Sequence, residues 1–77
     1  MKLMKKKGYE GTVRSVMDDE KTKCLGVVGT VHDLLEVGIL EAIDGVSVGM
    51  WMFIPAVGRN NAVFGGTRED ALSGIVA

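Results

Sequence analysis

The longest run of apolar residues in the chain lies between two loops that contain glycine. It covers residues 50–57 and includes Trp51 and Pro55. An apolar run bounded by turn residues is typical of a β-strand buried on both faces. Proline cannot donate a backbone hydrogen bond, so Pro55 should lie at a bulge, at a sheet edge or in the last turn of this strand. In a chain this small, we expect a closed sheet or a neighbouring subunit to cover the strand.

Two segments before this run also have strand patterns. Residues 9–17 alternate between two faces, and residues 22–32 carry several valines. Gly26 and Gly29 weaken the second strand and indicate a bulge or a strong bend. The charged residues 18–21 between the two strands predict a solvated turn.

Residues 33–43 permit two interpretations. Asp33 followed by Glu36 has the spacing of a capping box at the start of a helix. Against a helix, Gly38 would cost about 1 kcal/mol relative to alanine, and several residues of the segment are β-branched. We expect a turn over residues 33–36 followed by a strand over residues 37–43, with a helix as the alternative.

The C-terminal part predicts a polar loop, a short strand and one helical turn. Residues 58–61 are polar, residues 62–64 are apolar, and a pair of glycines follows. Thr67 has the position of a helix cap. Residues 71–77 are apolar almost to the last one, which favours a final strand docked in a sheet or against a partner.

About five short strands with turns roughly every ten residues are typical of a small antiparallel barrel or sandwich. We therefore predict a mostly-β fold in a single domain over residues 1–77, with room for one short helical turn. Residues 1–7 form a basic leader that contains Lys2, Lys5, Lys6 and Lys7. No apolar segment of signal-peptide length follows it.

Composition adds an argument about assembly. The chain is 47% apolar and only 5% aromatic, whereas a domain of this size buries only about 60% of its unfolded surface. Some apolar side chains should therefore face another copy of the chain. The net charge of −1 gives no general attraction to nucleic acid or to an acidic membrane.

The chain contains one cysteine, Cys24, and one histidine, His32. This pair excludes an internal disulfide and a structural zinc site, which takes four nitrogen or sulfur ligands. No apolar run approaches the length of a membrane helix. We predict a cytoplasmic protein with no metal and no cofactor. Cys24 and His32 are candidates for a nucleophile and its base, but a buried structural thiol and an ordinary strand-end histidine are favoured.

Several short motifs follow one another along the chain. They are Met1-Lys2-Leu3, Tyr9-Glu10-Gly11-Thr12-Val13, Lys23-Cys24-Leu25, residues 42–49 with Asp44, Gly45 and Gly49, the strand with Trp51, Gly58-Arg59-Asn60-Asn61-Ala62, Asp70-Ala71 and Gly74-Ile75-Val76. This order is similar to that of the vertex proteins of bacterial microcompartments, the pentameric shell family of ethanolamine-utilisation compartments and carboxysomes. The chain departs from the family pattern at Ser47 and Ala77, which replace a glycine and an aspartate.

The resemblance implies an OB-like, five-stranded antiparallel β-barrel, assembled as a five-membered ring at the vertices of a protein shell. Its partners would be copies of itself and other shell proteins, and it would have no catalytic residues. Such a ring closes through heterologous contacts.

Three groups of residues are candidates for a role in that assembly. Trp51 is either a subunit contact or plain core. The loop formed by Gly58, Arg59, Asn60, Asn61 and Ala62 either lines a pore or is an ordinary turn. A turn motif is formed by Asp44, Gly45 and Gly49. We expect the Asp44 carboxylate to accept hydrogen bonds from backbone N–H groups of this turn rather than to act as a general base.

Two other functions compete with the shell hypothesis. An OB-type binder of single-stranded nucleic acid would use Lys2, Lys5, Lys6, Lys7, Arg14 and Tyr9, but stacking aromatic residues are scarce. The segment Gly66-Thr67-Arg68-Glu69-Asp70-Ala71-Leu72 resembles the Gly-x-Thr-x-Glu-Glu-Ala helix start of small antitoxins of the HicB type. A helix across residues 67–76 would favour the antitoxin over the shell protein, and an enzyme is the least favoured class.

Overall fold

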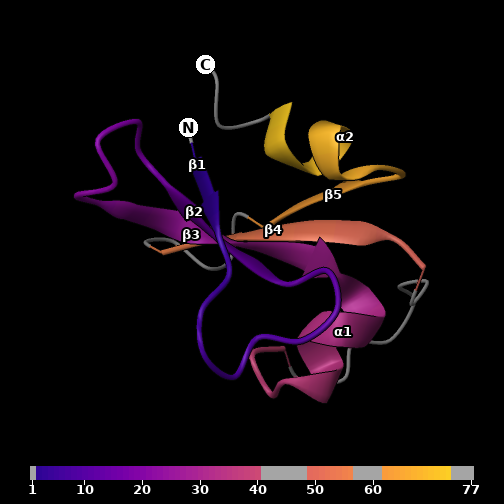
Figure 1. The fold of residues 1–77 in the computed structure, drawn as a ribbon. Helices are drawn as coiled ribbons and strands as arrows, with labels where there is room; N and C mark the ends of the chain where they lie inside the picture. The colour runs from indigo at the N-terminus through magenta and orange to yellow at the C-terminus, as the bar shows by residue number, and fades with distance from the viewer. Residues whose placement is uncertain (1, 41–48, 57–61, 74–77) are drawn as a thin grey trace.

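The computed structural model describes residues 2–40, 49–56 and 62–73 (Figure 1). Their elements are, in chain order, β1 (Lys2–Met4), β2 (Arg14–Met17), β3 (Cys24–Thr30), α1 (Val31–Glu36), β4 (Trp51–Pro55), β5 (Val63–Gly65) and α2 (Arg68–Leu72). All neighbouring strands are antiparallel, and the strands form a single sheet. The predicted mostly-β fold with five antiparallel strands is confirmed. Pro55 is the last residue of its strand, as predicted.

The strands pair in the order β1-β2-β3-β4-β5, so each strand lies beside its neighbour in sequence. Within the residues that the structure describes, β1 and β5 each have one strand neighbour. Closure of a barrel needs a pairing between the first and last strands, and the described pairings do not include one.

A bulge interrupts the hairpin formed by β2 and β3. Val16 lies opposite Gly26, whereas Met17 lies opposite Cys24, so Leu25 is the additional residue. This confirms the irregularity predicted at Gly26. A side chain at Gly26 would collide with the Ile54 carbonyl oxygen and would lie 2.7 Å from the Phe53 ring, so the close approach of β4 requires glycine here.

The helix α1 occupies the start of the segment for which we expected a turn and then a strand, so that expectation was wrong. The cap is Thr30, whose Oγ1 accepts a hydrogen bond from the Asp33 N–H at 3.3 Å. Residues 37–40 form turns rather than a strand, and residues 41–43 lie outside the described ranges.

Gly38 ends α1 rather than interrupting it. Its φ of +80° is the left-handed conformation that glycine adopts readily. The Gly38 N–H donates to the Leu35 carbonyl oxygen at 3.2 Å, and the Ile39 N–H donates to that of Leu34 at 3.1 Å. These two bonds form a Schellman motif, which satisfies the last carbonyl groups of the helix.

Each face of the sheet is covered by one helix, with α1 below the sheet and α2 above it in Figure 1. The α1-side core consists of Val13, Val31, Leu34, Met52 and Ile54. The α2-side core consists of Val16, Val28, Phe53, Ala71 and Leu72. β4 therefore contributes side chains to both cores, which confirms that this strand is buried on both faces.

Within the described residues, the two helices of the chain cover β4, one on each face of the sheet. The physical reason is that α1 and α2 each present buried apolar residues to one face of the sheet. The expected cover by a closed sheet or a neighbouring subunit stays a prediction. Among the described residues, Phe64 is the one large hydrophobic side chain that is exposed, at 39%. In the same part of the chain, neither helix is long and apolar enough to cross a membrane.

Candidate functional site

The predicted site residues fall partly outside the described ranges. Asp44, Gly45 and residues 58–61 lie there, so the turn motif and the pore loop stay predictions. Gly49 is exposed in a turn before β4, and Ala62 is half-buried against the α1-side core.

Trp51 is half-buried at the start of β4, where it packs against the α2-side core. It lies opposite Gly65 of β5. A side chain at Gly65 would lie 2.5 Å from the Asp70 Cβ, so glycine at this position allows α2 to rest directly on the edge strand. The register thus brings the first turn of α2 beside the indole of Trp51.

A shallow hollow of about 470 Å³ lies between Trp51 and the start of α2. Its lining residues are Trp51, Thr67, Arg68 and Glu69, and we call it the Trp51 hollow. Arg68 and Glu69 are exposed, and within the described part of the chain neither makes an ion pair. Tryptophan and arginine are enriched at protein-binding surfaces, whereas glutamate is depleted there.

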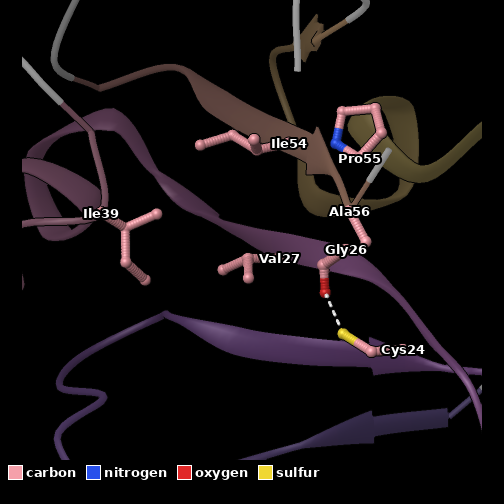
Figure 2. A pocket seen from close by; sticks show the side chains of 7 residues that line it. All are labelled: Cys24, Gly26, Val27, Ile39, Ile54, Pro55 and Ala56. Carbon is pink, nitrogen blue, oxygen red and sulfur yellow. Dashed lines mark hydrogen bonds between the residues drawn. The ribbon is translucent and has the colours of Figure 1, made fainter. Parts of the chain in front are cut away.

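A second hollow, of about 270 Å³, lies near the far end of the β3–β4 pair (Figure 2). Its lining is mostly apolar and consists of Cys24, Gly26, Val27, Ile39, Ile54, Pro55 and Ala56. Cys24 is exposed, so the predicted burial of its thiol was wrong. The Cys24 Sγ lies 3.6 Å from the Gly26 carbonyl oxygen and 3.5 Å from the Ser15 Oγ.

Cys24 and His32 do not form a nucleophile–base pair. Cys24 begins β3, whereas His32 lies in α1, beyond the other end of that strand. At roughly 3.3 Å per residue, β3 separates its two ends by about 20 Å. His32 is an exposed helix residue rather than the predicted strand-end histidine, and its ring nitrogens lie 3.3 Å from Asp33 and 3.6 Å from Glu36.

The most connected polar group in the described residues is the Thr12–Asp33 cluster, formed by Thr12, Thr30 and Asp33. The Thr12 N–H and hydroxyl donate to the Asp33 Oδ2 at 2.8 and 2.6 Å. The Thr30 N–H donates to the Thr12 Oγ1 at 2.9 Å. The cluster joins the loop before β2 to the first turn of α1.

These hydrogen bonds also set the acidity of the carboxyl group. The bonds from Thr12 are the main cause that lowers the pKa of Asp33 from 3.8 to about 2. A carboxylate this acidic is a poor base, and it lies between Thr12 and His32, so the imidazole does not reach the hydroxyl. The hydrogen bonds of the cluster therefore hold the loop before β2 against α1.

The residues considered for nucleic-acid binding do not make a stacking surface. The Arg14 Nη1 donates to the carbonyl oxygens of Gly11 and Val13, at 2.9 and 2.7 Å. Tyr9 is half-buried against the α1-side core. The exposed lysines of residues 5–7 are thus left without an adjacent exposed aromatic ring among these candidates.

The sequence-based list omitted Thr12, Thr30, Asp33 and Phe64, which the structure brings forward. Thr30 and Asp33 have the spacing of a capping box, so the sequence alone could have predicted that Thr30 caps a helix. No local pattern indicates that Thr12 binds Asp33. Comparison with known proteins finds no matching family model, no matching curated protein and no matching solved structure.

Proposed function

We propose that this chain is a binding protein of the antitoxin type, which acts by holding a partner protein and not by catalysis. The observation that carries the proposal is the capped helix α2 beside the Trp51 hollow. α2 covers Arg68–Leu72 of the helix expected over residues 67–76, and residues 74–76 lie outside the described ranges. Residues 66–72 resemble the helix start of HicB-type antitoxins, and two residues of that segment have the roles expected at a helix start. Thr67 caps the helix, since its Oγ1 accepts from the Asp70 N–H at 3.1 Å, and Ala71 is fully buried against the sheet.

The proposed binding surface is the Trp51 hollow. It combines a half-buried indole, which supplies apolar contact area, with the charges of Arg68 and Glu69 at its rim. Both charged side chains are exposed and belong to the first turn of α2, so the sheet and the helix cap hold them in place. The partner would be a small protein that offers a complementary pair of charges around an apolar side chain.

A second candidate is the shell-vertex function that the motif order implies. The observation that favours it is that β1 and β5 each have one strand neighbour within the described ranges, so copies can meet at these edges. We rank it second because α1 and α2 cover β4 among the described residues, so burial of this strand alone does not call for a ring. Both candidates are proteins that work in the cytoplasm.

A growth-rescue assay tests the antitoxin proposal, because antitoxins and their toxins act as pairs. The protein encoded next to this one is expressed from one inducible promoter and the chain from another. We expect the neighbour to arrest growth, the chain to relieve the arrest, and the two proteins to copurify. The double variant Arg68→Ala/Glu69→Ala should lose at least about tenfold in affinity.

The matched control is Glu20→Ala/Lys23→Ala, which also removes one cation and one anion from exposed positions. It should rescue growth like the unmodified chain. Two results together would favour the shell-vertex function over the antitoxin function. The chain would neither restore growth nor copurify with the neighbouring protein, and the purified chain would sediment as a ring of five copies.

A further inference from the structure

Among the described strands, β1 and β5 are the two outer strands of the sheet. β1 and β5 each have one neighbour among the described strands, and an edge strand presents unpaired N–H and C=O groups on its outer side. Because every neighbouring pair is antiparallel, the first and fifth strands run in the same direction. A second copy placed beside the first, in the same orientation, would therefore bring β1 alongside β5 as a parallel pair.

The two edges differ in charge. Lys2 is exposed on β1, and the exposed residues Lys5, Lys6 and Lys7 follow it. β5 carries no charge of its own, but α2 beside it carries one cation, Arg68, and two carboxylates, Glu69 and Asp70, of which Asp70 lies over Gly65. The basic edge repels a second basic edge and complements the acidic one.

Phe64, the one large hydrophobic side chain that is exposed in the described part of the chain, belongs to the β5 edge. Phe64 lies opposite Met52, whose side chain belongs to the α1-side core. Met4 lies opposite Ser15, which in turn lies opposite Val27 on the same side of the sheet. Phe64 of one copy and Met4 of the next therefore share a face when the sheet continues from copy to copy. A thioether beside an aromatic ring is a favourable contact.

We propose that the chain associates head to tail with itself, through parallel pairing of β5 in one copy with β1 in a second copy. In this arrangement, the segment that follows β5 in one copy and the segment that follows β1 in the other copy lie at the same end of the paired strands. The carboxylates of Glu69 and Asp70 then lie at the same end of the interface as the lysines at positions 5–7. The contact is heterologous, so it repeats from copy to copy and either closes into a ring or continues as a filament.

Disulfide trapping tests the contact, in a Cys24→Ser background that removes the native thiol. Neighbouring strands lie about 4.8 Å apart, which is within the range of Cα separations that a disulfide spans. Phe64→Cys and Met4→Cys chains are oxidised alone and as a mixture. We expect a linked dimer of the two different chains in the mixture and little linkage in either variant alone. Glu36→Cys, at an exposed position on α1, replaces Met4→Cys as the control and should not link to Phe64→Cys.

Sedimentation of the purified chain gives a second readout that does not depend on any partner protein. The unmodified chain should associate with rising concentration and less so in high salt, because opposite charges meet at the interface. Phe64→Lys places a cation opposite the basic edge and should weaken association about tenfold, with an unchanged circular dichroism spectrum.

Three results would overturn the proposal. They are a chain that stays monomeric at every concentration, association that Phe64→Lys does not change, and self-linkage of Phe64→Cys in place of mixed linkage. The last result would identify a two-fold contact between two β5 strands. None of these three results tests the antitoxin proposal, which depends on the growth-rescue assay alone.

Discussion

Thr12 and Asp33 are 21 residues apart in sequence, and Thr12 donates two hydrogen bonds to a single carboxylate oxygen of Asp33. One comes from the backbone N–H at 2.8 Å and the other from the hydroxyl at 2.6 Å. Hydrogen bonds to a charged group are stronger than those between neutral groups. This pair therefore holds the loop before β2 against α1.

Asp33→Ala should destabilise the fold by about 2 kcal/mol, because it removes a charged acceptor and leaves the Thr12 N–H without its partner. Urea unfolding at neutral pH measures the loss. Glu20→Gln, which removes a carboxylate from an exposed turn position, is the control and should change the free energy of unfolding by less than about 0.5 kcal/mol. Equal effects of the two substitutions would show that the hydrogen bonds to Asp33 contribute nothing specific.

The same carboxylate predicts a dependence of stability on pH. Its pKa is about 2 in the folded chain, below the ordinary value of 3.8, so the folded state binds the proton less readily than the unfolded state. The stabilisation is therefore complete above the ordinary value and is lost as the pH falls toward about 2. Unfolding curves recorded across this acidic range should converge for the unmodified chain and Asp33→Ala. A gap of constant size down to the lowest pH would contradict the assignment.

Gly26→Ala should destabilise the fold by more than about 2 kcal/mol. The new methyl group would collide with the Ile54 carbonyl oxygen, which is backbone and has no side-chain rotation to relieve the contact. Gly66→Ala is the matched control, because no atom lies within 4 Å of its added methyl group. Thermal unfolding should separate the two variants clearly, and similar melting temperatures would mean that β3 and β4 can move apart at little cost.

Thr67→Ala should weaken the fold by about 1 kcal/mol, the usual cost of losing a helix cap. The hydroxyl bond to the Asp70 N–H anchors a helix of five residues, which is too short to form without tertiary contacts. Thr67→Ser keeps the hydroxyl group and should restore nearly all of the stability. Chemical denaturation gives the free energy of unfolding of the unmodified chain and of both variants. A serine variant as unstable as the alanine variant would exclude loss of the cap as the cause.

Local signals in the sequence predicted much of this fold. Pro55 ended its strand, Gly26 marked a bulge, and Thr67 capped a helix, each through a constraint on its own backbone or its near neighbours. Gly38 misled the prediction of α1, because a glycine that ends a helix and one that interrupts it look alike in sequence. The conformation depends on the carbonyl groups of Leu34 and Leu35 that it satisfies.

The candidate site was less predictable than the fold. The Trp51 hollow depends on the pairing of Trp51 with Gly65, which lies fourteen positions later in the chain and gives no periodic signal. The exposure of Phe64 depends on which strand lies at the edge of the sheet. Both facts come from long-range pairing, which residue patterns alone do not determine.

Side chains of β4 alternate between the two apolar layers, with Met52 and Ile54 on one side and Phe53 on the other. The α1-side core and the α2-side core both contain side chains of the same five-residue strand. Displacement of β4 would therefore disrupt both cores together. Protection of amide protons against exchange with solvent should therefore disappear together above and below the sheet, and α1 and α2 should melt as one unit although the sheet separates them.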